Sequence, residues 1–183
     1  MLGFAGMVAG VVWATNQQMN TLLTKIEASE SAMMAVQDAV ATSYAEHAGD
    51  QAALDASLKE DAKAGVISIG QASHAILEWQ PIPLDPKLIE AKQAYLKHTA
   101  AWIAYLNAAA EDPAQFEADQ PDVDNTFRAF EKKLRDAVPP VALGDLKARV
   151  DAIFTNGNPP ADQSSGDTKS VRYAVGVSSF SLP

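Results

Sequence analysis

The chain contains no cysteine among its 183 residues. This absence excludes disulfide bonds, thiolate catalysis and thiolate metal sites. Basic residues are also scarce, because 14 Lys and Arg stand against 23 Asp and Glu, and the formal net charge is −9. Nucleic acid requires a basic surface, so the composition argues against a nucleic-acid partner.

The motifs that carry catalysis and cofactor binding are absent as well. The sequence contains no phosphate loop, no nucleophile elbow and no dinucleotide fingerprint. None of the three histidines follows a glutamate by three residues, which excludes the Glu-x-x-His pairs of a di-iron bundle. We therefore predict that the protein is not an enzyme and holds no cofactor.

Three weaker ligand patterns have simpler explanations. His74 and Glu78 lie one helical turn apart, but two ligands do not make a metal site, so a surface pair is favoured. The acidic segment 111–124 is no EF-hand, because a loop counted from Asp122 has Phe127 in place of the glycine and Lys133 at the twelfth position. Helix capping is favoured, with a site for a cation or a basic partner as the alternative. A noncovalent haem needs an axial His or Met facing a pocket, whereas Met33 and Met34 are expected to pack in a core.

The first 24 residues contain no charged side chain, and the first 14 are almost wholly apolar. Fourteen helical residues reach about 21 Å, short of a hydrocarbon core of about 30 Å. The uncharged extension to Leu23 adds the missing length, with its amides in the headgroup layer. We predict a transmembrane anchor helix over residues 1–23. The alternatives are a signal peptide cleaved after Ala14 and a buried core helix.

Three glycines fall on one face of this opening helix, namely Gly3, Gly6 and Gly10. In lipid such small residues let helices approach closely, although glycine is also simply common in membrane helices. We expect this face to pack against integral membrane protein subunits. Only Lys25 follows the apolar stretch closely, so the positive-inside rule favours a single-pass protein of the cell membrane with its main domain on the periplasmic, extracytoplasmic side.

Residues 24–155 show four amphipathic stripes with helical spacing. The first continues from the anchor to about residue 47 and is interrupted by Glu30. Gly49 and Asp50 then provide a helix end and a new N-cap, and the second helix is predicted over about residues 51–79. Asp85 caps the third helix, which begins with proline at its first position.

The third stripe, over about residues 88–109, is the most regular. The fourth runs from Val123 to Ile153 and is broken by Pro139-Pro140. Four stripes joined by short capped turns predict an all-α protein, an antiparallel four-helix bundle with a broken fourth helix.

The end of the chain changes in character. Residues 156–170 are rich in Pro, Gly, Ser and Asp, which indicates a flexible linker. Residues 171–183 alternate like a strand, and we predict an extended arm that adds to a partner, with a disordered terminus as the alternative. The expected partner contacts of this arm are Val171, Tyr173, Val175, Val177 and Phe180.

Together these features predict a noncatalytic accessory subunit of a larger membrane protein complex. The layout is similar to that of accessory subunits of respiratory or photosynthetic assemblies, and also to that of chemoreceptor-like helical sensor domains, although no motif supports either resemblance. The alternative is therefore a membrane-anchored ligand-binding or sensory bundle, with Trp79, Trp102 and Tyr105 as candidate pocket residues.

Overall fold

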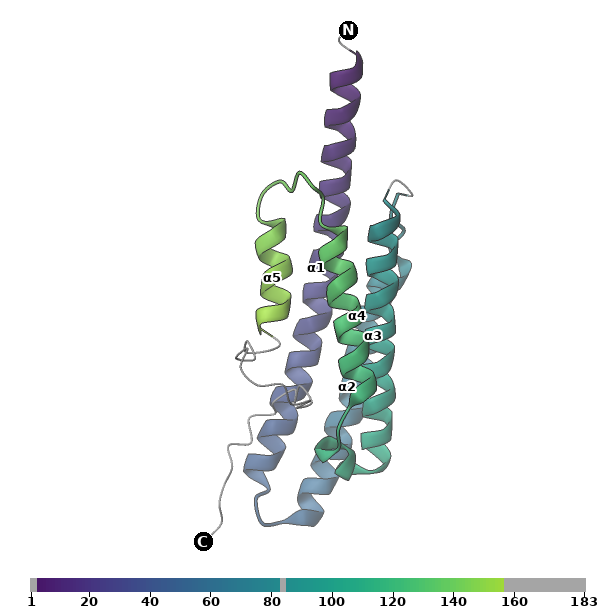
Figure 1. The fold of residues 1–183 in the computed structure, drawn as a ribbon. Helices are drawn as coiled ribbons and strands as arrows, with labels where there is room; N and C mark the ends of the chain where they lie inside the picture. Colours follow the sequence, from purple (N-terminus) through teal and green to yellow (C-terminus); the bar gives the residue numbers. More distant parts are fainter. Residues whose placement is uncertain (1–2, 83–84, 157–183) are drawn as a thin grey trace, which may run out of the picture.

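The computed structural model describes residues 3–82 and 85–156, with the backbone alone for residues 3–9 and 156. This part of the chain is an elongated all-α bundle in which α1 to α4 run antiparallel in sequence order (Figure 1). The elements are α1 (Gly3–Glu46), α2 (Gln51–Glu78), α3 (Pro86–Glu111), the short 3-10 helix η1 (Pro113–Glu117), α4 (Pro121–Ala137) and α5 (Leu146–Asn156). The helical bundle is thus confirmed, whereas the predicted arm and nearly all of the predicted linker lie outside the described residues.

The turns between helices form where local chemistry predicts them. Gly49 adopts a φ of +93° at the end of α1, a conformation that favours glycine. The carboxylate of Asp50 accepts a hydrogen bond from the backbone N–H of Ala53 and so caps α2. Asp85 caps α3 in the same way through the N–H of Lys87, with Pro86 at the first helical position.

The C-terminal end of α2 is capped by a side chain from another helix. Lys92 of α3 is buried, and its ammonium donates hydrogen bonds to the carbonyl oxygens of Leu77, at 2.9 Å, and of Trp79. These carbonyls belong to the end of a helix, where no intrahelical N–H is available. Lys92 therefore ties the end of α2 to α3.

The predicted break in the fourth helix is present. However, the part after the break, α5, does not continue along the same line as α4. The chain leaves α4 after Ala137, turns through Gly144 with a φ of +69°, and returns as α5. Helix α5 packs mainly against α1 and less against α4. The Arg149 guanidinium makes a two-pronged ion pair with the Glu27 carboxylate, with N···O distances of 2.6 and 2.7 Å. Helix α5 is therefore a fifth helix attached to α1.

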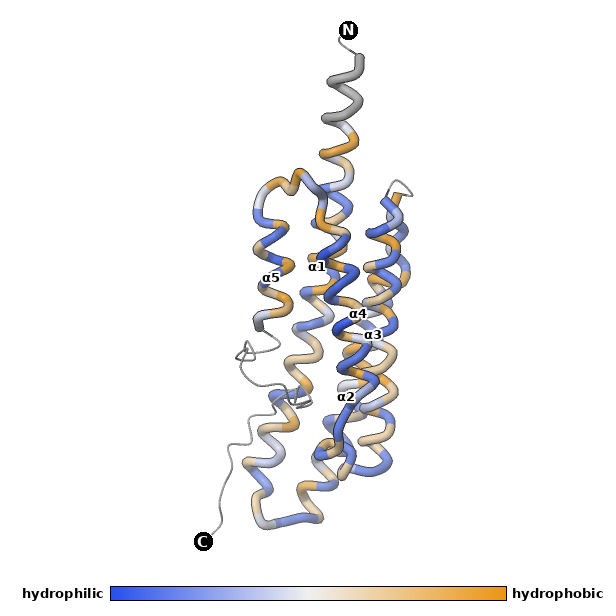
Figure 2. Tube along the Cα trace, in the orientation of Figure 1, coloured by the Kyte–Doolittle hydropathy of each residue, from blue (hydrophilic) through white to orange (hydrophobic). Residues whose placement is uncertain are grey.

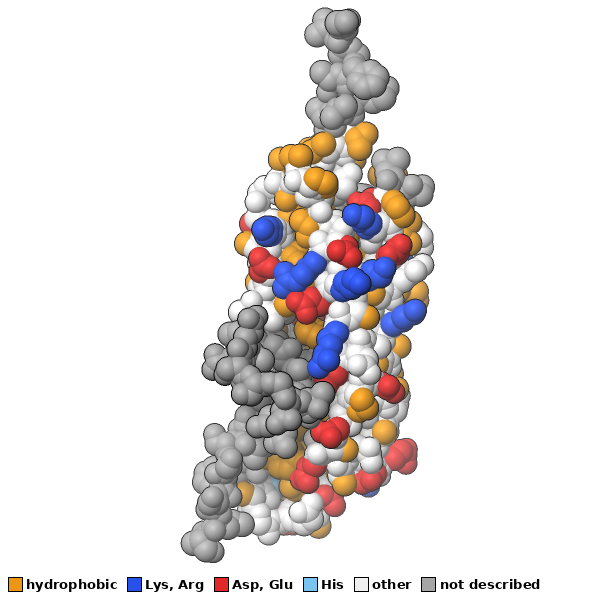
Figure 3. Space-filling model, viewed as in Figure 1, with side chains coloured by type: hydrophobic (Ala, Val, Ile, Leu, Met, Phe, Trp, Pro, Cys, Tyr) orange, Lys and Arg blue, Asp and Glu red, His pale blue; other side chains and the backbone are white. Residues whose placement is uncertain are grey.

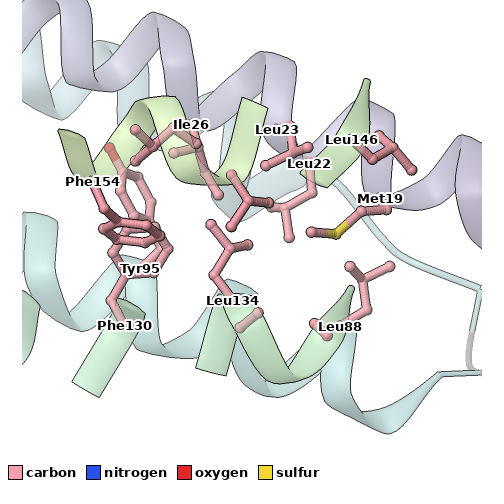
Figure 4. Close-up of a cluster of buried hydrophobic side chains, with 14 of the residues drawn as sticks. Met19, Leu22, Leu23, Ile26, Leu88, Tyr95, Phe130, Leu134, Leu146 and Phe154 are labelled. Atoms are coloured by element: carbon pink, nitrogen blue, oxygen red, sulfur yellow. The ribbon is translucent and has the colours of Figure 1, made fainter. Parts of the chain in front are cut away.

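Two groups of buried side chains form the core. The first core cluster lies towards the end of the bundle from which α1 protrudes (Figure 4). Its members are Met19, Leu22, Leu23, Ile26, Ile76, Leu88, Ala91, Tyr95, Phe127, Phe130, Leu134, Ala137, Leu146, Val150, Ile153 and Phe154. The second core cluster comprises Met33, Val36, Val40, Leu58, Ala62, Ile69, Trp102, Leu106, Ala109 and Val123.

The predicted membrane anchor over residues 1–23 is wrong. Within the described part of the chain, no helix combines the length and the hydropathy that crossing a bilayer requires. The physical reason is the run of amides from Asn16 to Gln18, with Asn20 beyond it, which any window of about 20 residues must include.

The second half of the predicted anchor is part of the bundle. Met19, Leu22 and Leu23 are completely buried in the first core cluster. Residues 3–14 of α1 precede the amides, and at 1.5 Å per residue they cover only about 18 Å of the roughly 30 Å of a hydrocarbon core. The predicted single-pass localisation in the cell membrane, with a periplasmic bundle, falls with the anchor.

Candidate functional site

Exposed apolar side chains gather at the end of the bundle from which α1 protrudes. The part of the chain whose side chains are described has eight large hydrophobic residues that are exposed, and six of them lie at this end. One is Leu77, in the last turn of α2. We call the other five the apolar end: Val11 and Trp13 on α1, Ile82 after α2, and Val141 and Leu143 between α4 and α5. Figure 2 shows hydrophobic residues on α1 where it leaves the bundle and on the neighbouring loop.

Two amide side chains of α1 hold the other segments against it. The Asn16 amide donates to the carbonyl of Val141 at 2.9 Å and accepts from the N–H of Leu143 at 2.7 Å. The Gln18 amide oxygen accepts from the N–H of Ile82 at 3.1 Å. These hydrogen bonds fix both connecting segments to α1. The positions of Ile82, Val141 and Leu143 relative to α1 are therefore defined by the fold.

The apolar end carries no charge of its own. Residues 3–24, 79–84 and 138–144 contain no Asp, Glu, Lys or Arg. Figure 3 shows hydrophobic side chains around the base of the protruding helix, with the acidic and basic side chains further down the bundle. Such a surface matches a partner that is also apolar and uncharged.

The three glycines predicted to form a packing face all lie in α1. Gly3, Gly6 and Gly10 are separated by three and four residues, so the helix places them on one side. Gly10 is exposed, and a Cβ added there would meet no heavy atom within 4 Å. This side of the helix is therefore open at Gly10. The predicted arm residues from Val171 to Phe180 lie outside the described residues.

A cavity of about 280 Å³ lies between the two core clusters, next to the last turns of α5. It is bounded by α1, α3, α4 and α5, and residues of both clusters line it. The lining consists of Glu27, Glu30, Met33, Met34, Gln37, His98, Trp102, Phe127, Arg149, Ala152 and Ile153. Glu30, which interrupts the first apolar stripe of the sequence, therefore lines this cavity.

Two titratable groups of the cavity are strongly affected by burial. The hydroxyl of Tyr95 donates a hydrogen bond of 2.9 Å to the Glu30 carboxylate. Burial nevertheless raises the pKa of Glu30 from 4.5 to about 7, because the charged form loses its hydration. Burial lowers the pKa of His98 from 6.5 to about 4, so His98 is neutral at physiological pH.

The structure brings only one of the three candidate pocket residues to the cavity. Trp102 lines it, whereas Trp79 packs beside the first core cluster. Tyr105 makes edge contacts with Trp102 and Phe116, with ring centroids 5.7 Å apart in each pair. Tryptophan and tyrosine patterns alone therefore did not locate the cavity.

The other candidate ligand groups are dispersed. His74 and Glu78 form an exposed pair with an N···O distance of 3.4 Å. In the described ranges, no three His, Asp or Glu side chains come close enough together to hold a metal ion. Sequence reasoning missed Asn16 and Gln18 as structural residues, although amides within an uncharged run were a visible signal.

Comparison with protein-family models, with curated proteins and with solved structures finds no match for this chain. The function must therefore be argued from the two features above, the apolar end and the cavity.

Proposed function

We propose that this protein is a noncatalytic accessory protein that docks through its apolar end onto an apolar helical surface of a different protein. The observation that carries this proposal is the clustering of Val11, Trp13, Ile82, Val141 and Leu143, all exposed, at one end of the bundle. Exposed apolar side chains gathered at one end of a protein are typical of interaction surfaces.

The shape of the apolar end suits a helical partner. Helix α1 offers an apolar segment that is open at Gly10, and the 138–144 loop and Ile82 flank it where it enters the bundle. Asn16 and Gln18 lie two positions apart, so the 138–144 loop and Ile82 contact roughly opposite sides of α1. A partner helix laid along one side of α1 would meet the protruding segment and the flanking segment on that side.

The net charge of −9 favours a different protein over a second copy of this chain. Two copies would each bring the same acidic bundle, and like charges oppose association at moderate ionic strength. A partner without a strong negative charge does not carry this penalty. The apolar end itself has no charge to pair, so the contact would be made mainly by apolar burial.

The test is quantitative co-purification from the native source with a tag on the full chain. The variant Trp13→Asp places a charge in the apolar end, while Ile67→Asp places the same charge on an equally exposed residue in the middle of α2, since both parent side chains are 61% exposed. We expect Trp13→Asp to reduce the stoichiometric partner at least tenfold and Ile67→Asp to leave it unchanged. Circular dichroism of both variants verifies that the bundle is intact.

Two outcomes would overturn the proposal. One is equal retention of the partner by the two variants, which would place the contact elsewhere. The other is self-association in sedimentation equilibrium that Trp13→Asp abolishes, since the occupant would then be a second copy. The expectation that the partner is an integral membrane subunit of an energy-transducing complex stays a prediction from the sequence, and mass spectrometry of the co-purified material identifies the partner.

A further inference from the structure

The cavity between the two core clusters has the properties of a small-molecule site. Its volume of about 280 Å³ lies just below the range for drug-sized ligand pockets, which begins near 300 Å³, and so suits a small ligand. It is bounded by four helices and reaches both core clusters. The cavity is distinct from the apolar end and shares no lining residue with it.

Among the residues that the structure describes, the charges around the cavity leave one carboxyl group, that of Glu30, without a cationic partner. Arg149 is occupied by the two-pronged ion pair with Glu27, and it also donates to Asn20 and to Thr24. Glu30 accepts one hydrogen bond, from the neutral hydroxyl of Tyr95. With Glu27 and Arg149 cancelling, an ionised Glu30 gives the cavity a net charge of −1.

The remaining walls are apolar or neutral. Met33, Trp102, Phe127 and Ile153 contribute apolar surface. His98 is buried and uncharged near neutral pH, and its Nδ1 lies 3.2 Å from the hydroxyl oxygen of Thr126. The cavity thus combines aromatic and aliphatic walls with one carboxyl group, that of Glu30, which has no cationic partner among the described residues.

We propose that this cavity binds a small organic ammonium ion, with the cationic nitrogen at the Glu30 carboxylate and an apolar body against Trp102 and Phe127. The ammonium group would replace the hydration that burial removes from the carboxylate. Aromatic faces add to the attraction for a cation in a desolvated site.

Other classes of ligand fit the walls less well. An anion would have to compete with Glu27 for Arg149, since the fork of the guanidinium already holds that carboxylate. A metal ion requires three or more protein ligands, and no such cluster exists among the described residues. A neutral apolar ligand can bind beside protonated Glu30, but it gains no attraction from the ionised carboxylate, so above pH 7 it is expected to bind less tightly than an ammonium ion.

The experiment is calorimetric titration of the full chain with 2-phenylethylamine and with the isosteric alcohol 2-phenylethanol. We expect the amine to bind at least tenfold more tightly than the alcohol. In Glu30→Gln this preference should disappear, because the amide keeps the shape and the acceptor for Tyr95 but removes the charge. The control is Asp38→Asn, which changes an exposed carboxylate on the same helix and should leave the preference intact.

A second variant tests the location independently of charge. Ala152 is exposed and lines the cavity, so Ala152→Phe introduces a ring at its boundary. We expect Ala152→Phe to weaken binding of both probes at least tenfold. Thermal unfolding of each variant shows whether the fold is retained.

The pH dependence gives a third readout. The titratable groups that line the cavity or bond to Glu30 are Tyr95 and His98 on α3 and the Glu27–Arg149 pair between α1 and α5, and α4 contributes none to the lining. Because Glu30 titrates near pH 7, its ionised fraction rises about tenfold between pH 6 and pH 8. Amine affinity should rise by a similar factor, and the rise should be absent in Glu30→Gln.

The proposal is overturned by any of three results. These are no measurable heat with millimolar amine, equal affinity for the amine and the alcohol, and amine binding that survives Glu30→Gln unchanged. None of these results bears on docking through the apolar end, so failure of one proposal leaves the other standing.

Discussion

The two core clusters of the bundle are packed by different means. In the first core cluster, aromatic rings from three helices meet: Tyr95 and Phe130 lie 4.7 Å apart between ring centroids, and Phe127 and Phe154 lie 5.5 Å apart. In the second, the helices meet around small residues such as Ala62 and Ala109. Both clusters contain large side chains, but in the second Leu106 packs close to the backbone of α2 at Gly65, where the helices approach one another closely.

Helix α5 accounts for much of this difference. Its side chains Leu146, Val150, Ile153 and Phe154 enter the first core cluster, and it contributes none to the second. The cavity lies where α5 ends and the packing changes from one type to the other. Imperfect filling at such a junction explains why the cavity is located there.

Removing one ring of the first core cluster should have the largest effect on stability. Phe130 is completely buried, and Phe130→Ala is expected to lower the free energy of unfolding by about 3–5 kcal/mol. Urea denaturation followed by circular dichroism measures the loss. The control is Phe116→Ala in η1, where the ring is only partly buried, and a loss as large as that of Phe130→Ala would contradict this account of the cluster.

The free energy of unfolding should depend on pH through two groups that line the cavity, Glu30 and His98. Folding raises the pKa of Glu30 from 4.5 to about 7, so the folded chain holds this proton more tightly and the free energy of unfolding falls as pH rises through that range. Folding lowers the pKa of His98 from 6.5 to about 4, so its contribution rises with pH over nearly the same range. The two contributions oppose each other in the native protein.

The substitution Glu30→Gln removes the contribution of Glu30 and leaves that of His98. The stability of the native protein relative to Glu30→Gln should fall by roughly 1–3 kcal/mol between pH 4.5 and pH 7.5. Urea denaturation at a series of pH values measures this difference, with Asp38→Asn as the control. A constant difference across the range would show that Glu30 is not a buried acid.

The second core cluster should be sensitive to added volume. A Cβ at Gly65 would lie 2.9 Å from side-chain atoms of both Leu106 and Val36, so Gly65→Ala is expected to lower the free energy of unfolding by about 1–2 kcal/mol. Gly70→Ala on the same helix meets nothing within 4 Å and should stabilise by up to about 1 kcal/mol, since alanine favours helix. If the denaturation midpoints of Gly65→Ala and Gly70→Ala shift in the same direction, then Gly65 is not closely packed against Leu106 and Val36.

The smallest effect is expected from the ion pair that attaches α5. Arg149→Lys keeps the charge but loses the two-pronged contact with Glu27, and should cost about 1 kcal/mol. Hydrogen exchange should accelerate in α5 and not in α2. The exposed Arg128→Lys serves as control, and equal exchange in the two variants would show that the pair does not hold α5.

Much of the fold was predictable because its signals are local. Gly49, Asp50, Asp85 and Pro86 act through their own backbone and near neighbours, and the helix boundaries predicted from them are confirmed. The anchor was predicted wrongly because an uncharged run meets the requirements of lipid and of a bundle core alike. Only packing against other helices shows that Met19 is a core residue.

The candidate sites were only partly predictable. The interruption of a stripe by Glu30 was visible in the sequence, but its proximity to Tyr95, 65 residues away, required the tertiary structure. The apolar end depends equally on distant contacts, since Asn16 meets Leu143 across 127 residues. Exposure of an apolar residue at a turn has no local signature.

Helix α1 continues without a break from Gly3 to Glu46, a rod about 66 Å long. One part of this rod carries Trp13 and another carries Glu30. Because the helix is continuous, a partner bound to its protruding part also fixes the orientation of the rest of the bundle. The bundle would then be held at a defined distance and angle from its partner.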